Sequence, residues 1–155
     1  MISDVHGNLL DAEADALVNT VNTVGVMGKG IALQFKNAYP DNFQAYRAAC
    51  QRHELRAGHM FVFDVGQLLR PRWIVNFPTK RHWKSPSRLS DIEAGLDDLR
   101  CVIEERNIRS IAVPPLGCGN GGLRWTDVRP LIEMKLGDLD LRVLLYPPEG
   151  CASPD

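Results

Sequence analysis

The feature that most constrains this fold is the alternation of short apolar runs with longer segments of helical periodicity. Apolar runs typical of strands lie at residues 16–22, 60–65, 72–77, 108–116 and 141–146. Helical patterns occupy residues 30–39, 41–50, 90–103 and 126–136. Strands that alternate with helices predict an α/β fold, a three-layer α/β/α sandwich around a mixed, largely parallel sheet.

The ends of the expected helices carry residues that favour starts and stops. Pro40 stops the first helix, and Gly137 ends the last. Three side chains are expected to cap helix starts: Asp41, Thr126, and Ser90 in an S-x-x-E capping box with Glu93. No repeat, linker or low-complexity segment interrupts the 155 residues, so we expect one domain over residues 1–155.

Composition excludes several classes of protein. Hydrophobic residues make up 45% and charged residues 24% of the chain, as in an ordinary soluble protein. No apolar run reaches the length of a membrane span, and the N-terminus lacks the pattern of a secretory signal. The four cysteines, at positions 50, 101, 118 and 151, form no C-x-x-C pair. We therefore expect a cytoplasmic protein with no metal site, no disulfide framework and no cofactor.

Three polar segments each follow a predicted strand, at residues 22–30, 77–83 and 116–123. In parallel α/β sheets, ligands bind beyond the carboxyl ends of the strands. We therefore expect these segments to meet at one edge of the sheet and to form one site.

Two of these segments are rich in glycine and precede helices. The first, with Gly25, Gly28 and Lys29, has only two residues between its glycines and lacks the Ser or Thr of a Walker motif. The second, residues 117–122, matches the dinucleotide pattern G-x-G-x-x-G, but that pattern normally opens the first strand–helix–strand unit, and here a single strand follows. Backbone N–H groups in two such loops can instead grip a diphosphate from both sides.

A basic and aromatic interval lies between Asp64 and Asp91, and it contains no acidic residue. Its cations are Arg70, Arg72, Lys80, Arg81, Lys84 and Arg88, and its rings include Trp73, Phe77, His82 and Trp83. Cations interleaved with rings suit single-stranded nucleic acid, because cations track phosphates while bases stack on rings. A solvated loop that balances the acidic segment after it explains the same composition.

Four segments, taken in order, resemble the signatures of macrodomains, which bind ADP-ribose. They are "GNLL" (7–10), "ALVNTVN" (16–22), "GVMGKGIALQF" (25–35) and "PPLGCGNGGLRW" (114–125). The pairing of "MGKGIALQF" with "NFPTKRHW" (76–83) is most similar to the DarG branch of the family. Its members are antitoxins that remove ADP-ribose from thymidine in single-stranded DNA and oppose the toxin DarT. The resemblance covers residues 3–146 and implies the same glycohydrolase activity and substrate, ADP-ribosylated single-stranded DNA.

The resemblance also assigns an ADP-ribose site. The implied binding residues are Asn8, Leu9, Asn22, Gly28, Lys29, Gly30, Ile31, Gly117, Cys118, Gly119, Asn120, Gly121 and Tyr146. Those of the first glycine loop flank the diphosphate and distal ribose, and those of the second close on the phosphates. Asn22 is assigned to the distal ribose hydroxyls, and Tyr146 to packing on adenine. Asn8 replaces the usual aspartate that accepts from the adenine amino group, so a weaker neutral hydrogen bond is expected.

Lys80 is the implied catalytic residue, because it matches the essential lysine of DarG and of the related terminal ADP-ribose protein glycohydrolase. Its amine either attacks the anomeric carbon or, when charged, steadies the departing thymine or a phosphate. Attack requires that the pKa of Lys80 be lowered. The cations Arg81 and Lys84 and partial desolvation by Trp83 or Phe77 are expected to lower it. The second glycine loop lacks the catalytic aspartate of the protein-directed relative. The identity of the general acid or base is therefore left open. His82 can transfer a proton at neutral pH, but it can equally stack on DNA.

The implied DNA-binding residues are Arg81, His82, Trp83 and Lys84, next to Lys80. Two alternatives are a module that only binds ADP-ribose and a hydrolase that acts on ADP-ribosylated protein. In the DarG family the toxin is thought to be engaged through a further C-terminal region, which we expect to be absent because the sequence ends with "PPEGCASPD" (147–155). We therefore expect an isolated catalytic domain that is monomeric, contacts no membrane and holds no stable toxin partner.

Overall fold

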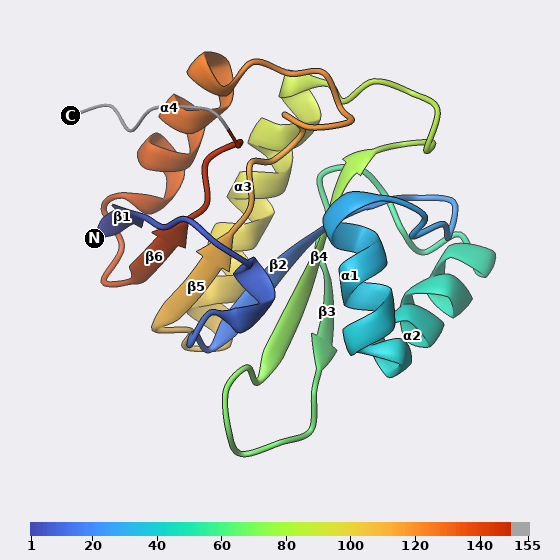
Figure 1. The fold of residues 1–155 in the computed structure, drawn as a ribbon, viewed down its shortest axis with the longest axis horizontal. Coiled ribbons are helices and arrows are strands. Elements are labelled where there is room, and N and C mark those ends of the chain that lie inside the picture. Colours follow the sequence, from blue (N-terminus) through green and yellow to red (C-terminus); the bar gives the residue numbers. More distant parts are fainter. Residues whose placement is uncertain (150–155) are drawn as a thin grey trace.

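The computed structural model describes residues 1–149 as one six-stranded sheet with helices on both faces (Figure 1). The strands are β1 (Ile2–Asp4), β2 (Ala16–Asn22), β3 (Phe61–Asp64), β4 (Trp73–Lys80), β5 (Ser110–Val113) and β6 (Arg142–Leu145). The helices are α1 (Gly30–Ala38), α2 (Pro40–Gln51), α3 (Leu89–Glu105) and α4 (Trp125–Leu136), with a short 3-10 helix at Leu9–Asp11. The predicted alternation of strands and helices is confirmed.

The sheet has the strand order β1-β6-β5-β2-β4-β3. Four neighbouring pairs are parallel, and only β3 and β4 run antiparallel. The largely parallel sheet is therefore as expected. The sequence analysis missed β1, a three-residue strand at the sheet edge that pairs Ile2 with Val143 of β6.

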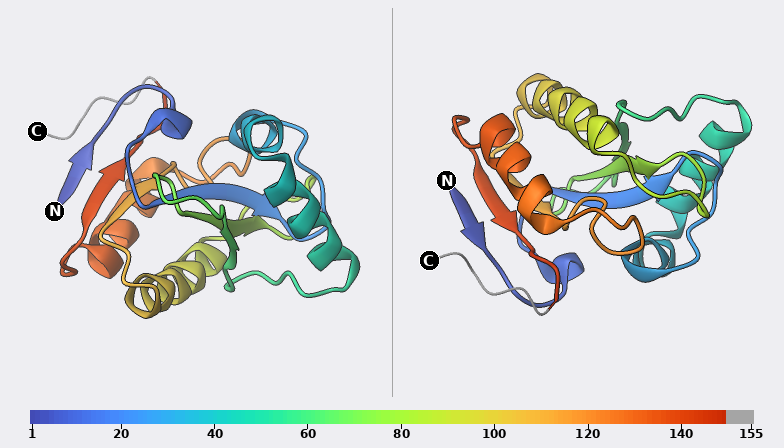
Figure 2. Two further views of the ribbon diagram at one scale, coloured as in Figure 1. Left: turned by 90° about the horizontal axis from the view of Figure 1, so that it is seen from below. Right: turned by 90° about the horizontal axis from the view of Figure 1, so that it is seen from above.

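Helices α1 and α2 cover one face of the sheet, and α3 and α4 cover the other (Figure 2). The α3 face is the larger core, and the apolar positions predicted from helical spacing, Ile92, Leu96, Leu99 and Ile103, are all buried there. On the opposite face, Phe35 of α1 packs against Leu17 and Ile74 of the central strands. The two cores fix the central strands β2, β4 and β5 between them.

The three predicted helix caps are wrong. Helix α2 starts at Pro40, so Asp41 lies within its first turn. In the same way α3 starts at Leu89, before Ser90, and α4 starts at Trp125, before Thr126. None of these helices has a side-chain cap hydrogen bond. Gly137 does follow the last residue of α4, as predicted.

The parallel strands β2, β4 and β5 end at the same edge of the sheet, where the chain leaves each strand for a loop. Strand β4 continues to Lys80, three residues further than the predicted strand. Across residues 1–149, no helix has the length and apolar character needed to cross a membrane.

Candidate functional site

A cleft of about 820 Å³ opens at the carboxyl ends of β2, β4 and β5. Its walls come from three parts of the chain, residues 20–32, 79–84 and 114–121. These are the three segments that were expected to converge, so their predicted convergence at one edge of the sheet is confirmed.

The first glycine loop is shaped by the side chain of Asn22, the last residue of β2. Its Oδ1 accepts hydrogen bonds from the backbone N–H of Val24 and Val26, at 3.1 and 3.3 Å, and its Nδ2 donates to the Val26 carbonyl at 2.8 Å. Asn22 also lines the cleft, as predicted. Both polar atoms of its side chain are nevertheless hydrogen-bonded within the loop. Asn22 therefore holds the shape of the loop in addition to being a candidate ribose ligand.

Behind Asn22 lies Tyr46 of α2, which sequence reasoning missed. The fully buried Tyr46 hydroxyl lies 2.8 Å from both the carbonyl oxygen and Oδ1 of Asn22. Burial raises the pKa of this phenol, which keeps it protonated and able to donate. No sequence motif links a tyrosine on α2 to the end of β2, because their contact arises only from packing.

Helix α1 begins at the cleft wall with free backbone donors. Its N-cap residue Lys29 makes no side-chain capping bond, and the N–H groups of Gly30, Ile31 and Ala32 have no acceptor within residues 1–149. All four residues line the cleft. Free N–H groups at the positive end of a helix form a binding site for an oxyanion such as a phosphate.

The second glycine loop closes the opposite wall. A Cβ atom on Gly121 would lie 2.2 Å from Ser87 Oγ and 2.4 Å from the Gly117 carbonyl oxygen, so no larger residue fits there. The loop is held by hydrogen bonds of 2.9 Å from Ser87 N to Gly121 O and from Leu123 N to Gly117 O. A Cβ atom on Gly30 would lie 3.9 Å from Asn120 Nδ2, so the two glycine loops approach each other across the cleft.

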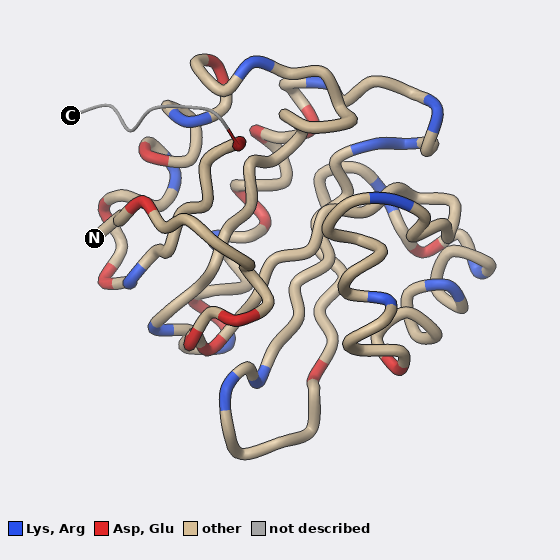
Figure 3. The backbone as a smooth tube through the Cα atoms, viewed as in Figure 1, with Lys and Arg blue, Asp and Glu red and all other residues tan. Residues whose placement is uncertain are grey.

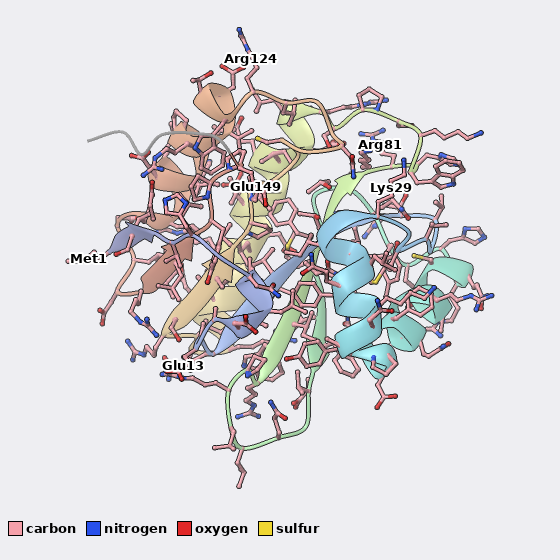
Figure 4. The ribbon with its side chains drawn as sticks, in the orientation of Figure 1. Met1, Glu13, Lys29, Arg81, Arg124 and Glu149 are labelled. Atoms are coloured by element: carbon pink, nitrogen blue, oxygen red, sulfur yellow. The ribbon has the colours of Figure 1, made fainter. Side chains whose placement is uncertain are left out.

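The charge of the cleft is entirely positive among the residues that the structure describes. Lys29, Lys80 and Lys84 line it, and no carboxylate does. Figure 4 shows Lys29 and Arg81 at the same end of the molecule, where α1 begins and β4 ends. Figure 3 shows the same cluster of basic positions along the start of α1 and the loop from β4 to α3. This charge suits an anionic ligand.

Lys80 is the last residue of β4 and lines the cleft, as predicted. Its Nζ donates a long hydrogen bond of 3.4 Å to the Trp83 carbonyl oxygen. The expected cationic neighbour Arg81 turns away, because its guanidinium pairs with Asp91 of α3 at 3.2 Å. Phe77 is also absent from the cleft walls, since it is fully buried against Gly95 of α3. Trp83 and Lys84 remain as neighbours in the cleft.

A compact aromatic turn follows Lys80. The rings of His82 and Trp83 stack with centroids 5.4 Å apart, and Lys84 Nζ lies 4.8 Å from the Trp83 ring centroid. Thr23 Oγ1 donates to the Arg81 carbonyl oxygen at 2.6 Å and so joins the first glycine loop to this turn. Of the four predicted DNA-binding residues, Trp83 and Lys84 line the cleft, whereas Arg81 and His82 lie outside it.

The residues predicted to hold adenine do not line the cleft, and neither does Cys118. Asn8 Oδ1 accepts from Leu10 N at 3.0 Å and caps the 3-10 helix. Leu9 and Tyr146 are buried in the cluster that contains Phe35, and Ile31 packs against the same cluster while lining the cleft. Burial raises the pKa of Tyr146. Their assignment to adenine stays a prediction.

Several cleft residues were not foreseen. Thr20, Val21, Val26, Ala32, Thr79, Pro114 and Pro115 also line the walls. Most of them are immediate neighbours of predicted residues, so their positions in sequence were the available signal. Of the four cysteines, Cys50, Cys101 and Cys118 form no disulfide within residues 1–149, and Cys151 lies outside the described residues.

Comparison with known proteins gives a consistent set of relatives. Residues 18–132 match the Macro domain family. The chain is 57% identical over 149 residues to a DNA ADP-ribosyl glycohydrolase of Thermus aquaticus, and 58% identical over 151 residues to that of Mycobacterium tuberculosis. These alignments cover 96% and 97% of this chain but only 41% and 43% of the relatives, so the chain spans less than half their length.

Solved structures show the same similarity in three dimensions. The macrodomain of Mycobacterium tuberculosis DarG superposes with a TM-score of 0.94 at 57% identity, covering 96% of this chain and 99% of that one. Thermosipho africanus DarTG in complex with ADP-ribose superposes with a TM-score of 0.90 at 37% identity, covering 99% of this chain and 43% of that one. Similarity at this level extends over the cleft and all three of its walls.

Proposed function

This chain belongs to the Macro domain family, and from that premise we propose that it is a glycohydrolase domain that removes ADP-ribose from thymidine in single-stranded DNA. In this role it acts as the antitoxin to a DarT-like ADP-ribosyltransferase. The observation that carries the proposal is the position of Lys80, in a positive cleft between two glycine loops. The identity of 57% to a DNA ADP-ribosyl glycohydrolase supports the same substrate.

ADP-ribose fits the cleft between the start of α1 and the second glycine loop. The diphosphate binds the free N–H groups at the start of α1 and the loop at residues 117–121 on the other side, with Lys29 adding charge. The adenosine end extends past Ile31 toward the cluster with Leu9 and Tyr146. The distal ribose then lies toward the end of β4, where Lys80 is found.

The reaction separates C1″ of the distal ribose from N3 of thymine. In the covalent route, neutral Lys80 Nζ bonds to C1″ while the C1″–N3 bond breaks. N3 takes the bonding electron pair and then a proton that Nζ releases. The C1″–O4″ bond of the resulting glycosylamine then breaks as Nζ forms a double bond to C1″, and O4″ takes the remaining Nζ proton. Water hydrolyses this imine, which frees the ribose and restores the amine. In the electrostatic route, charged Lys80 only stabilises the negative charge that develops on thymine. An imide nitrogen is a good leaving group, which is consistent with a cleft without a carboxylate.

Trp83 and Lys84 are placed to hold the DNA next to the modified base. Trp83 is 47% exposed, which leaves its ring available for stacking on a base, and Lys84 adds a cation beside it. Arg81 is paired with Asp91 and contributes less to such contacts than the sequence suggested. The favoured DNA path therefore runs over Trp83 and Lys84.

The experiment that tests this proposal is incubation of the purified chain with an ADP-ribosylated thymidine oligonucleotide. We expect plain oligonucleotide and free ADP-ribose as products. Lys80→Ala is expected to abolish cleavage while retaining ADP-ribose binding, and Lys135→Ala, which removes a lysine paired with Asp97 far from the cleft, serves as the control. Borohydride trapping of a lysine adduct separates the covalent route from the electrostatic one. Binding without any cleavage by the wild-type chain would instead support a module that only recognises ADP-ribose.

We propose that contact with the toxin, a second part of the antitoxin role, lies outside this chain. Contact with the toxin is assigned to the part of the relatives that this chain does not span. The domain is proposed to act as a monomer, which size-exclusion chromatography tests. Cys50 and Cys101 form no disulfide in the part of the chain that the structure describes, which supports a reducing compartment such as the cytoplasm.

A further inference from the structure

The pairing of β4 with β2 changes register at the cleft. Val21 pairs with Pro78, but the next residue, Asn22, pairs with Lys80. Thr79 is thus an extra residue in β4 with no partner in β2. In a regular strand, successive side chains point to opposite faces, yet Thr79 and Lys80 both line the cleft. A register shift of this kind redirects side chains and is common next to active sites.

Thr79 lines the cleft, and its hydroxyl is accessible there without a hydrogen-bond partner within residues 1–149. It is 6% exposed, and it makes no side-chain hydrogen bond to any residue that the structure describes. By contrast, the polar atoms of Asn22 bond to its own loop, and Lys80 Nζ bonds to the Trp83 carbonyl. A hydroxyl that faces a cleft and has no partner in the protein is available to hydrogen-bond a ligand.

We infer that the Thr79 hydroxyl is a specificity contact for the distal ribose of ADP-ribose, a role that rests on the proposed function. Lys80 must reach C1″ of that sugar, and Thr79 is its immediate neighbour, with Cα atoms about 3.8 Å apart. A hydroxyl at this point hydrogen-bonds a ribose hydroxyl and holds the sugar with C1″ toward Lys80. The register shift is what brings both side chains to the same sugar.

The test is a comparison of two ligands, ADP-ribose and ADP, because ADP lacks the distal ribose. Thr79→Val removes the hydroxyl with little change in shape, and Thr79→Ser keeps it. We expect Thr79→Val to weaken ADP-ribose binding by about threefold to tenfold in calorimetry, and to leave ADP binding unchanged. Thr79→Ser is expected to bind ADP-ribose like the wild type. Thr126→Val, at the start of α4, is the matched control.

Cleavage kinetics add a second readout. With ADP-ribosylated oligonucleotide, Thr79→Val is expected to lower kcat as well as raise KM, because a loosely held sugar presents C1″ less often to Lys80. Unchanged ADP-ribose affinity in a folded Thr79→Val protein would overturn the inference, and so would an equal loss for ADP. The binding comparison does not depend on catalysis. A wild-type chain that binds ADP-ribose but cleaves nothing would overturn the proposed function and leave this inference standing.

Discussion

At the scale of single residues, Tyr46 shows how a side chain outside the cleft controls its shape. Its hydroxyl serves two acceptors of Asn22, and Asn22 in turn orders residues 22–26. We expect Tyr46→Phe to lower the free energy of unfolding by about 1–3 kcal/mol, because the buried hydrogen bond from its hydroxyl to Asn22 is lost. ADP-ribose affinity should fall as well, since the first glycine loop becomes less ordered.

Denaturant unfolding and calorimetry measure these two effects. Tyr39→Phe is the matched control, because the Tyr39 hydroxyl makes no hydrogen bond to any residue within 1–149. Equal stability of the two variants would show that the contact between Tyr46 and Asn22 contributes nothing.

Sequence reasoning at this scale succeeded where a residue's neighbours in the chain determine its position. Lys80 ends a strand and the glycines of both loops lie in segments that follow strands, so their location was predictable. The ion pair of Arg81 was not predictable, because its partner Asp91 lies across the β4–α3 loop and meets it only in three dimensions. The free hydroxyl of Thr79 depends on a register shift that no sequence pattern marks.

At the scale of elements, the second glycine loop depends on the absence of one side chain. Gly121→Ala would place a methyl group 2.4 Å from the Gly117 carbonyl oxygen, a backbone atom that side-chain motion does not relieve. We expect this variant to lose about 1–3 kcal/mol of unfolding free energy and most of its ADP-ribose affinity.

Gly119→Ala is the control within the same loop. A Cβ atom there meets nothing within 4 Å, and its backbone does not have a positive φ angle. Thermal unfolding should therefore show little change for Gly119→Ala and a clear decrease in Tm for Gly121→Ala. Similar Tm values for the two variants would mean that the loop adapts to the extra methyl group.

Helices and strands were predictable in kind and order, but helix starts were not. Asp41, Ser90 and Thr126 are good capping residues, yet each lies just inside its helix. Proline is favourable at the first helical position, so Pro40 both ends α1 and begins α2. Strand β1 was missed because three residues at a sheet edge carry too little apolar pattern to be recognised.

At the scale of the whole molecule, charge is distributed unevenly. The chain has a formal net charge of −1, yet the charged residues of the cleft within 1–149 are all lysines. We expect the affinity for ADP-ribosylated oligonucleotide to fall more steeply with salt than the affinity for ADP-ribose, because DNA adds phosphate contacts. The measurement uses the Lys80→Ala background, in which the oligonucleotide stays intact.

Lys84→Ala should lower the slope of log affinity against log salt by about 0.7, the value for one phosphate contact on a single strand. Lys36→Ala, on the outer part of α1, is the control and should leave the slope unchanged. If the Lys80→Ala background has the same salt slope with and without Lys84→Ala or Lys36→Ala, the DNA does not run over Trp83 and Lys84.

The site as a whole was predictable because it follows from topology. Parallel strands bring their carboxyl ends to one edge, so three segments distant in sequence were expected to meet there, and they do. The packing behind that edge was not predictable. Two interactions arise only from the packing of helices on the sheet. They are the hydrogen bond from Tyr46 of α2 to Asn22 and the ion pair between Asp91 of α3 and Arg81.

The unpaired amide groups at the start of α1 have a practical consequence. They belong to the main chain, so no substitution except by proline deletes them. Under the proposed function, a variant without the Lys80 amine would still bind the pyrophosphate and would remain attached to ADP-ribosylated DNA without cleaving it. Fused to a fluorescent tag, it would serve as a probe that reports where thymidine lesions accumulate in a genome.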